Sequence, residues 1–405
     1  MLFRKSRARQ SIQRLGISKI FFKCSNFGST IYDMTGFLKE ELTKSVKVPY
    51  DEAFYNWLRS KLKKKPLIDT NNMIDCEMQH YYIYMHPSKS GWLSKHGFKE
   101  YVESMPRQLN IVDSSFDISD MGQVLTKALL GQEEKNSFDS TNMSVNPFVL
   151  SLEQQIYFLY NILLGDGDFL IPFLTNLLDK HGQVKFSYLD AGNLIPDVID
   201  GLLIKFSGLA YTSDDREKIY EIEKMKDIII NDIKEQKEKK GSGSRREQEC
   251  ITRLEWMIDL GIINKNDSRN YEFTKFGKVF VKEAGNIYNK YIESGFPDRS
   301  VSELLDNNFY QLLNSSIYPN SILDEDESLI EFIGESYNIL KGISGYCLLR
   351  PLLLLSNILS ISKNNKAYIE YRHGRELLEK VFKEMPDKIY FTTDRFGEDV
   401  QVKLM

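Results

Sequence analysis

Cysteine and histidine side chains gather in one part of the sequence, between Asp75 and His96. Cys76 and His80 stand four residues apart, so on a helix they would share a face, and His86 follows. Zinc binds thiolates and imidazoles, and it needs four ligands that converge tetrahedrally. The spacing matches no zinc motif, and no second pair of ligands accompanies the first. We therefore expect a structural cluster of tyrosine and histidine here, with no metal and no cofactor. An enzyme built around Cys76, His80, His86 and His96 remains a lesser alternative.

Paired carboxylates occur in the run Asp166-Gly167-Asp168. Two neighbouring acids can serve as general acid and base when burial or a close charge shifts one pKa. This run, however, lies between two stretches of helical periodicity, residues 152–164 and 169–180. Two acids around a glycine between helices more often form a turn and an N-cap. We expect the turn.

Other signatures of catalysis are missing from the sequence. The Gly-Ser repeat at residues 241–244 lacks the Gly-Lys-Ser/Thr of a phosphate-binding loop. Nuclease-like ExK spacing with an upstream acid on a strand does not stand out, and the sequence around Glu370 predicts a helix, which counts against a nuclease. No nucleophile stands beside a base. The sequence therefore predicts a protein that is not an enzyme.

Length and composition are those of an ordinary soluble protein. The chain has 405 residues, of which 42% are hydrophobic and 27% charged, enough for two to four domains. Its net charge is −4, so any contact with nucleic acid must come from local basic patches.

Cysteine usage and hydropathy predict a cytoplasmic protein. The four cysteines are far apart and form no CxxC pair, which is typical of reduced thiols. The longest apolar run, residues 346–361, is interrupted by Arg350-Pro351 and Ser356-Asn357. It is too short and too polar to span a bilayer, so we expect a buried helix and no membrane contact.

The first 32 residues are basic, with no acid before Asp33. Three interpretations stay open: a transit peptide, an arm that follows phosphates, and a solvated extension. The basic residues are Arg4, Lys5, Arg7, Arg9, Arg14, Lys19 and Lys23.

The clearest local pattern runs from Ser244 to Lys290. Ser244 and Glu247 have the spacing of a capping box, in which each side chain satisfies a backbone N–H of the first helical turn. Apolar residues then recur at helical spacing up to Gly261, a residue suited to a left-handed helix end. They are Ile251, Leu254, Met257 and Ile258.

Two short strands are predicted after this helix. Residues 262–263 and the alternating run at 271–273 flank a polar turn at 264–270. Thr274 can cap a closing helix. The residues that we expect this helix to turn inward are Val279, Phe280 and Ile287.

The stretch RLEWMIDLGIINKN…YEFTKFGKVF closely resembles the winged-helix superfamily. The resemblance implies a mainly α fold with small β-wings (α+β), as tandem winged-helix domains linked by helices. A C-terminal unit has the same order, with three helical patterns and then two alternating strands around a turn at 394–397. A weak internal repeat, in which Ser119 and Gly122 match Thr274 and Gly277, predicts a further unit ending near Leu130.

These patterns divide the chain into five parts. A long helix within the third part, at 214–240, alternates acids and lysines on one face and has an isoleucine-rich stripe that a partner helix could use. The parts are 1–130 (basic arm and winged-helix-like unit), 131–147 (linker), 148–295 (helical region with the central winged helix at 244–293), 296–326 (loop-rich connector) and 327–405 (C-terminal winged-helix-like unit).

Winged helices most often contact DNA through the helix before the hairpin and through the hairpin itself. The resemblance therefore implies twelve nucleic-acid-binding residues: Arg245, Arg246, Arg253, Lys265, Arg269, Lys275 and Lys278 in the central unit, and Arg372, Arg375, Lys380, Lys383 and Arg395 in the C-terminal unit. Four acids on the central helix oppose this role. They are Glu247, Glu249, Glu255 and Asp259.

The architecture resembles accessory subunits of prokaryotic anti-phage defence or restriction-like systems, and partner subunits of chromosome-organising ATPases. It implies a non-catalytic, DNA-associated subunit of a larger complex, whose other subunits include an ATPase or a nuclease. The alternative is a protein–protein scaffold whose winged helices never contact nucleic acid, which the acids of the central helix favour.

Overall fold

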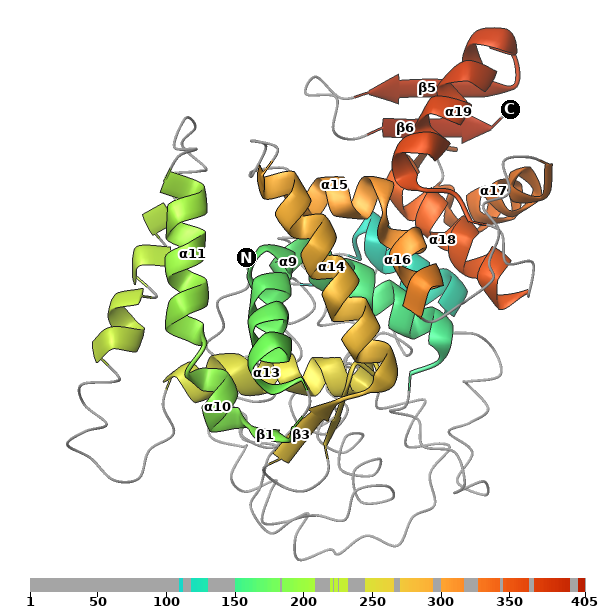
Figure 1. Cartoon of the computed structure of the whole chain (residues 1–405). Helices are drawn as coiled ribbons and strands as arrows, with labels where there is room; N and C mark the ends of the chain where they lie inside the picture. Colours follow the sequence, from blue (N-terminus) through green and yellow to red (C-terminus); the bar gives the residue numbers. More distant parts are fainter. Residues whose placement is uncertain are drawn as a thin grey trace, which may run out of the picture.

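The computed structural model describes fourteen stretches of the chain, and they are mostly helical, with two small antiparallel sheets (Figure 1). This confirms the prediction of a mainly α fold with small β elements. The stretches are residues 109–111, 118–129, 150–182, 184–207, 219–220, 222–224, 226–231, 245–265, 270–293, 300–316, 327–342, 345–363, 368–393 and 400–404. The expectations for the basic arm, the cluster of Cys76, His80, His86 and His96, and the linker at 131–147 lie outside them.

A 30-residue helix, α9 (Leu152–His181), lies in the middle of the molecule. A capping box starts it, because Ser151 Oγ accepts the Gln154 N–H while Gln154 Oε1 accepts the Ser151 N–H. The helix continues through Asp166-Gly167-Asp168, so the predicted turn there is wrong. Gly167 is needed for packing: a Cβ atom on it would lie 3.0 Å from a methyl group of Val301.

Pro172 stands inside α9 and supplies no N–H to the carbonyl of Asp168. The Tyr288 hydroxyl lies 3.4 Å from that oxygen and donates to it instead. Figure 1 shows α9 as two limbs at an angle, as expected of a helix with a proline in its interior. By length and hydropathy α9 could cross a membrane, but 78% of its most apolar window is buried within the protein.

The central unit (residues 152–293) contains the predicted helix, hairpin and closing helix. The chain turns at Gly261 with φ of +69°, and Ile263 pairs with Phe273 in the hairpin that follows. Its sheet has the order β1-β3-β2, with Phe186 opposite Tyr271. The elements after α9 are β1 (Phe186–Ser187), α10 (Tyr188–Gly192), α11 (Ile195–Ser207), α13 (Arg245–Asp259), β2 (Ile263–Lys265), β3 (Asn270–Phe273) and α14 (Lys275–Glu293).

A tight junction joins the hairpin to α14. Thr274 Oγ1 accepts the N–H of Gly277, and the Thr274 N–H donates to the carbonyl of Ile262 at 3.0 Å. A Cβ atom on Gly277 would lie 1.9 Å from that carbonyl oxygen, so only glycine fits.

The same junction recurs at residues 109–129. Ser119 Oγ accepts the N–H of Gly122, and the Ser119 N–H donates to the carbonyl of Ile111 at 3.0 Å. A Cβ atom on Gly122 would lie 2.0 Å from that oxygen, and Asn110 has φ of +53° where Gly261 has +69°. The repeat in the sequence is therefore matched by a repeat of backbone geometry. Helix α7 (Asp120–Gln123) and a π-helix, η2 (Val124–Leu129), follow it.

The C-terminal unit (residues 327–404) repeats the order of the central one. Its sheet has the order β4-β6-β5, so the first strand again pairs with the last. The elements are α17 (Glu327–Leu340), β4 (Cys347–Leu348), α18 (Leu349–Ser362), α19 (Tyr371–Glu384), β5 (Ile389–Thr393) and β6 (Val400–Leu404). The predicted buried apolar helix is α18, in which Leu349, Leu352, Leu353, Leu354 and Leu355 are almost fully buried.

Two helices lie between the units, α15 (Ser300–Asn307) and α16 (Phe309–Ser316). The prediction of a loop-rich connector is wrong for this part. Val301, Leu304, Leu305, Phe309 and Leu312 are buried, so the segment belongs to the core.

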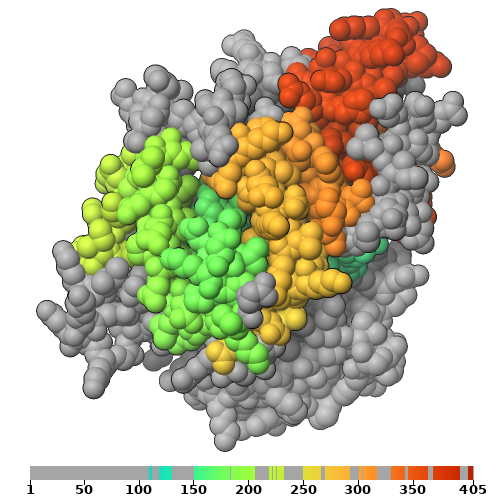
Figure 2. Space-filling model, viewed as in Figure 1, coloured from blue at the N-terminus to red at the C-terminus, as the bar shows by residue number. Residues whose placement is uncertain are grey.

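Buried apolar residues from Leu109 to Val402 form one continuous cluster, with α9 contacting helices of both units. The stripe predicted for residues 214–240 joins it, since Ile222 and Ile229 are buried. Its described residues therefore serve the protein's own core rather than a partner helix. Figure 2 shows the C-terminal unit projecting at one end of the molecule.

Candidate nucleic-acid interface

Helix α13, which should be the DNA-reading helix of the central unit, lies inside the protein. Every residue from Cys250 to Leu260 is buried or half-buried. Trp256 and Arg253 are its two largest fully buried side chains. A helix in the major groove needs one free face, so residues 250–260 cannot provide that contact.

Arg253, one of the predicted nucleic-acid contacts, is part of the core. Its guanidinium forms a two-point bond with Asp166, with Nε 2.6 Å from Oδ2 and Nη2 3.0 Å from Oδ1. The group also lies 4.0 Å from the centre of the Phe169 ring. The side chains of Arg253 and Asp166 are 1% and 0% exposed. The planar guanidinium matches the carboxylate, which makes a buried charge tolerable.

The second acid of that run is also paired. Asp168 forms an ion pair with Lys205 of α11, and the Tyr288 hydroxyl lies 2.9 Å from the Lys205 ammonium. Asp166 and Asp168 thus hold two different cations from two different helices. Each carboxylate fastens a helix to α9, so the pair is not arranged as a general acid and base.

Lys265 on the hairpin is held by an acid of α13. Its ammonium lies 2.7 Å from Glu255 Oε1, which also accepts the Tyr271 hydroxyl at 3.2 Å. Glu255 is nearly fully buried and Lys265 is 30% exposed. The charge that was expected to contact phosphate is therefore neutralised by a carboxylate of α13.

Two other candidates of the central unit lie at the start of α14. Lys275 is exposed and Lys278 is half-buried, and exposed Lys282 continues the same helical face. Lys282 was not among the predicted contacts, although its i, i+4 spacing from Lys278 in the sequence could have indicated it. The side chains of Arg245 and Arg246, and the whole of Arg269, lie outside the described part of the chain.

Helix α19 of the C-terminal unit has the free face that α13 lacks. Tyr371, Gly374 and Leu378 are buried against α18, where a Cβ atom on Gly374 would lie 2.7 Å from a methyl group of Leu353. The opposite face is exposed and carries Arg372, Glu376, Lys380 and Lys383. The helix therefore lies flat on its neighbour with its charges outward.

The charges on α19 differ in their availability. Arg375 Nε lies 2.9 Å from Glu379 and Arg372 Nε lies 3.8 Å from Glu376. Within the described ranges, Lys380 and Lys383 belong to no ion pair. The predicted hairpin after α19 is present as β5 and β6, with Ile389 opposite Leu404. Arg395, between them in sequence, lies outside the described residues.

A half-buried polar cluster fixes the C-terminal unit to the rest of the molecule. The Arg350 guanidinium lies 2.6 Å from both the Tyr160 hydroxyl of α9 and Asp306 of α15, and it stacks 4.0 Å from the centre of the Tyr371 ring. These partners lie up to 190 residues away in sequence. No local pattern could have indicated them.

Glu370, which ends the segment before α19, belongs to the same region. It is not within the helix that was predicted around it. Its carboxylate accepts the N–H of Gln311 at 2.8 Å and the N–H groups of Phe309 and Tyr310, at the first turn of α16. Burial raises the pKa of Glu370 to about 8, against the opposing effect of these backbone donors.

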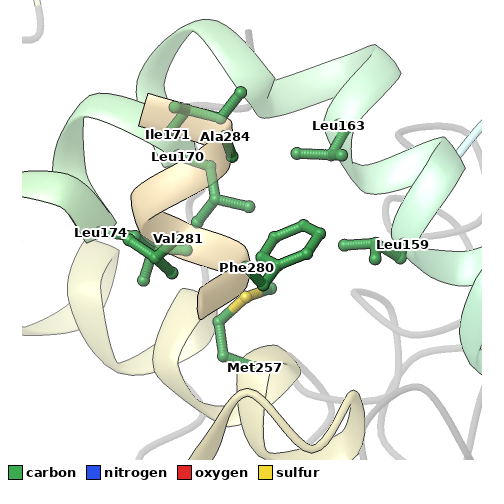
Figure 3. Close-up of a pocket in the computed structure, with 9 residues that line it drawn as sticks. All are labelled: Leu159, Leu163, Leu170, Ile171, Leu174, Met257, Phe280, Val281 and Ala284. Carbon is green, nitrogen blue, oxygen red and sulfur yellow. The ribbon is translucent and has the colours of Figure 1, made fainter. Parts of the chain in front are cut away.

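A small cavity lies between α9, α13 and α14 (Figure 3). Its volume is about 10 Å³, and all its lining side chains are apolar. A space of this size without polar partners is a packing void rather than a ligand site. The lining residues are Leu159, Leu163, Leu170, Ile171, Leu174, Met257, Phe280, Val281 and Ala284.

No family model, curated protein or solved structure significantly matches this chain. Across the described stretches, no three metal-ligating side chains come together. The arrangement that the structure does offer is an exposed basic helix beside a hairpin, at the projecting end of the molecule.

Proposed function

We propose that this chain is a non-catalytic, DNA-associated subunit of a larger multiprotein complex, and that the C-terminal unit makes the nucleic-acid contact. One observation carries the proposal. Helix α19 exposes Arg372, Lys380 and Lys383, whereas its counterpart α13 is buried along most of its length. Among the described side chains, α19 thus offers exposed charge that could attract phosphate, whereas residues 250–260 of α13 offer none.

The order of the elements supports a winged-helix fold for both units. Each has a long helix, a short strand, further helices and two strands, and in each sheet the first strand pairs with the last. In winged helices the helix before the hairpin binds in the major groove of DNA, and the hairpin contacts the DNA backbone. The position of α19 fits this role. The central unit then acts as the scaffold that carries it.

A protein scaffold is the second candidate. The ion pairs of Arg375 with Glu379 and of Arg372 with Glu376 reduce the net positive charge of α19. A helix with alternating charges also suits a protein partner. In either case the complex would be of the anti-phage defence, restriction-like or chromosome-organising kind, with an ATPase or nuclease as the partner subunit.

Salt dependence of DNA binding tests the proposal. Fluorescence anisotropy of a labelled mixed-sequence duplex should give an affinity that falls steeply with salt, because bound lysines release counterions. Lys380→Ala/Lys383→Ala should lower the salt slope by about 2. A matched control, Lys180→Ala/Lys224→Ala, removes two exposed lysines elsewhere and should leave the slope unchanged. Absence of salt-dependent binding would favour the scaffold.

A further inference from the structure

The outer face of the C-terminal sheet carries an aromatic and cationic row. Tyr390 of β5 is opposite Lys403 of β6, and Cys347 is opposite Val402, which places Tyr346 on the other side of Lys403. The rings of Tyr346 and Tyr390 have their centres 5.8 Å apart. The Lys403 ammonium lies 5.3 Å from the centre of the Tyr346 ring. The three side chains therefore share one face of the sheet.

This face points away from the core. Ile389, Val400 and Val402 are buried, while the alternate positions Tyr390 and Gln401 are exposed. Tyr390 is 42% exposed. An aromatic side chain exposed to this extent is available for contact with another molecule.

The Tyr390 ring is held in position from two sides. Tyr346 approaches it at an interplanar angle of 78°, and Phe382 of α19 approaches at 77° with ring centres 6.4 Å apart. Perpendicular contacts of this kind are favourable for aromatic pairs. They fix the ring before any ligand binds, so little conformational entropy is lost on stacking.

Positive charge surrounds the row. Lys403 lies within it, Lys388 is exposed in the turn between α19 and β5, and the exposed Lys380 and Lys383 lie on α19, which also supplies Phe382. Glu384, at the end of α19, and Asp387, beside Lys388 in this turn, are exposed acids that offset part of this charge. The surface therefore combines a fixed aromatic ring with a cationic surround, which matches a base and its flanking phosphates.

We propose that Tyr390, fixed by Tyr346 and Phe382, stacks an unpaired nucleobase while Lys403 contacts the adjacent phosphate. The inference rests on the proposed function and names its substrate class: nucleic acid with single-stranded or unpaired bases. A paired base presents only its edges in the grooves, so its ring face is not available to Tyr390. A continuous duplex can contact the lysines, but it cannot stack on the ring of Tyr390.

A stacking experiment on the full chain tests this. The probe is a single-stranded oligonucleotide that carries the fluorescent base 2-aminopurine, compared with the same strand in a duplex. Wild type should bind the single strand more tightly and quench the fluorescent base. Tyr390→Leu should weaken single-strand binding by about tenfold and abolish the quenching, because base–aromatic stacking is lost. The affinity of Tyr390→Leu for the duplex should equal that of wild type.

Two control variants separate stacking from other effects. Tyr390→Phe keeps the ring and should bind and quench like wild type. Tyr220→Leu removes a tyrosine that is 63% exposed on another helix and should have no effect. Far-ultraviolet circular dichroism of each variant checks that the fold is kept.

Failure of the inference differs from failure of the proposed function. Suppose that the protein shows no preference for the single strand, and that its duplex binding is weakened by Lys380→Ala/Lys383→Ala but not by Tyr390→Leu. This result overturns the inference and leaves the proposed function standing. No binding of either nucleic acid overturns both and leaves the face to a protein partner.

Discussion

At the scale of single residues, the ion pair of Arg253 with Asp166 indicates that this arginine stabilises the core rather than binding DNA. Arg253→Ala should lower the free energy of unfolding by about 3–5 kcal/mol, because it leaves Asp166 buried without its partner. Urea unfolding followed by circular dichroism measures this. Arg372→Ala, on the exposed face of α19, should change it by less than about 0.5 kcal/mol. A stable Arg253→Ala protein with weakened DNA binding would instead place this arginine at the interface.

Glu370 makes stability depend on pH. Its pKa is about 8 in the folded protein against an ordinary 4.5, so the folded state binds the proton more tightly. The stability that this proton contributes is fully present below pH 4.5 and is lost as the pH rises through 8. Glu370→Gln cannot ionise and still accepts the Gln311 N–H. Its unfolding free energy should therefore fall less with pH between these values.

Urea unfolding at a series of pH values measures that difference. Glu376→Gln removes an exposed glutamate on α19 and should follow the wild-type pH profile. If Glu370→Gln also keeps the wild-type profile, the carboxylate is ionised in the folded protein and its donors outweigh its burial.

At the scale of elements, the sequence predicts structure wherever a few neighbouring residues decide it. The turn at Gly261 after α13, the hairpin and the Thr274 cap all depend on residues close together in the sequence, and all three are present. The turn predicted at Asp166-Gly167-Asp168 fails because distant residues decide it. Val301 packs on Gly167 and Tyr288 bonds to the carbonyl freed by Pro172, so one helix continues where two were expected.

The two tight junctions give a prediction about glycine. Gly277→Ala and Gly122→Ala should each lower the free energy of unfolding by more than about 2 kcal/mol, because the new Cβ would collide with the carbonyl of Ile262 or Ile111. Gly201→Ala is the matched control. It lies exposed in α11 with no atom within 4 Å of the new Cβ, so it should stabilise the protein by about 0.5–1 kcal/mol.

Thermal unfolding of the three variants checks this prediction. Equal losses at Gly277 and Gly122 would support a duplicated unit. A small loss of unfolding free energy at Gly122 alone would mean that the repeat is limited to the backbone geometry of the junction.

At the scale of the whole molecule, the candidate interface could be predicted only in part. The basic residues of α19 follow from an amphipathic pattern that the structure keeps, with Leu378 buried and Lys380 exposed. Helix α13 has an equally clear pattern, yet it is buried, because Arg253 pairs with Asp166 of α9 and Glu255 pairs with Lys265 of β2. Pattern fixes which face of a helix is apolar, but it does not show whether the polar face meets water or another part of the chain.

The position of that interface depends on Arg350, which ties the C-terminal unit to α9 through Tyr160 and to α15 through Asp306. Arg350→Ala should loosen this connection while the core of the central unit stays intact. Native-state hydrogen exchange followed by mass spectrometry should show amides of α17, α18 and α19 exchanging about tenfold faster, and those of α13 and α14 unchanged. Lys363→Ala removes an exposed pair with Glu335 and should change neither group. Uniform acceleration in Arg350→Ala would mean that the two units unfold together and that the single core, rather than this arginine, holds the interface in place.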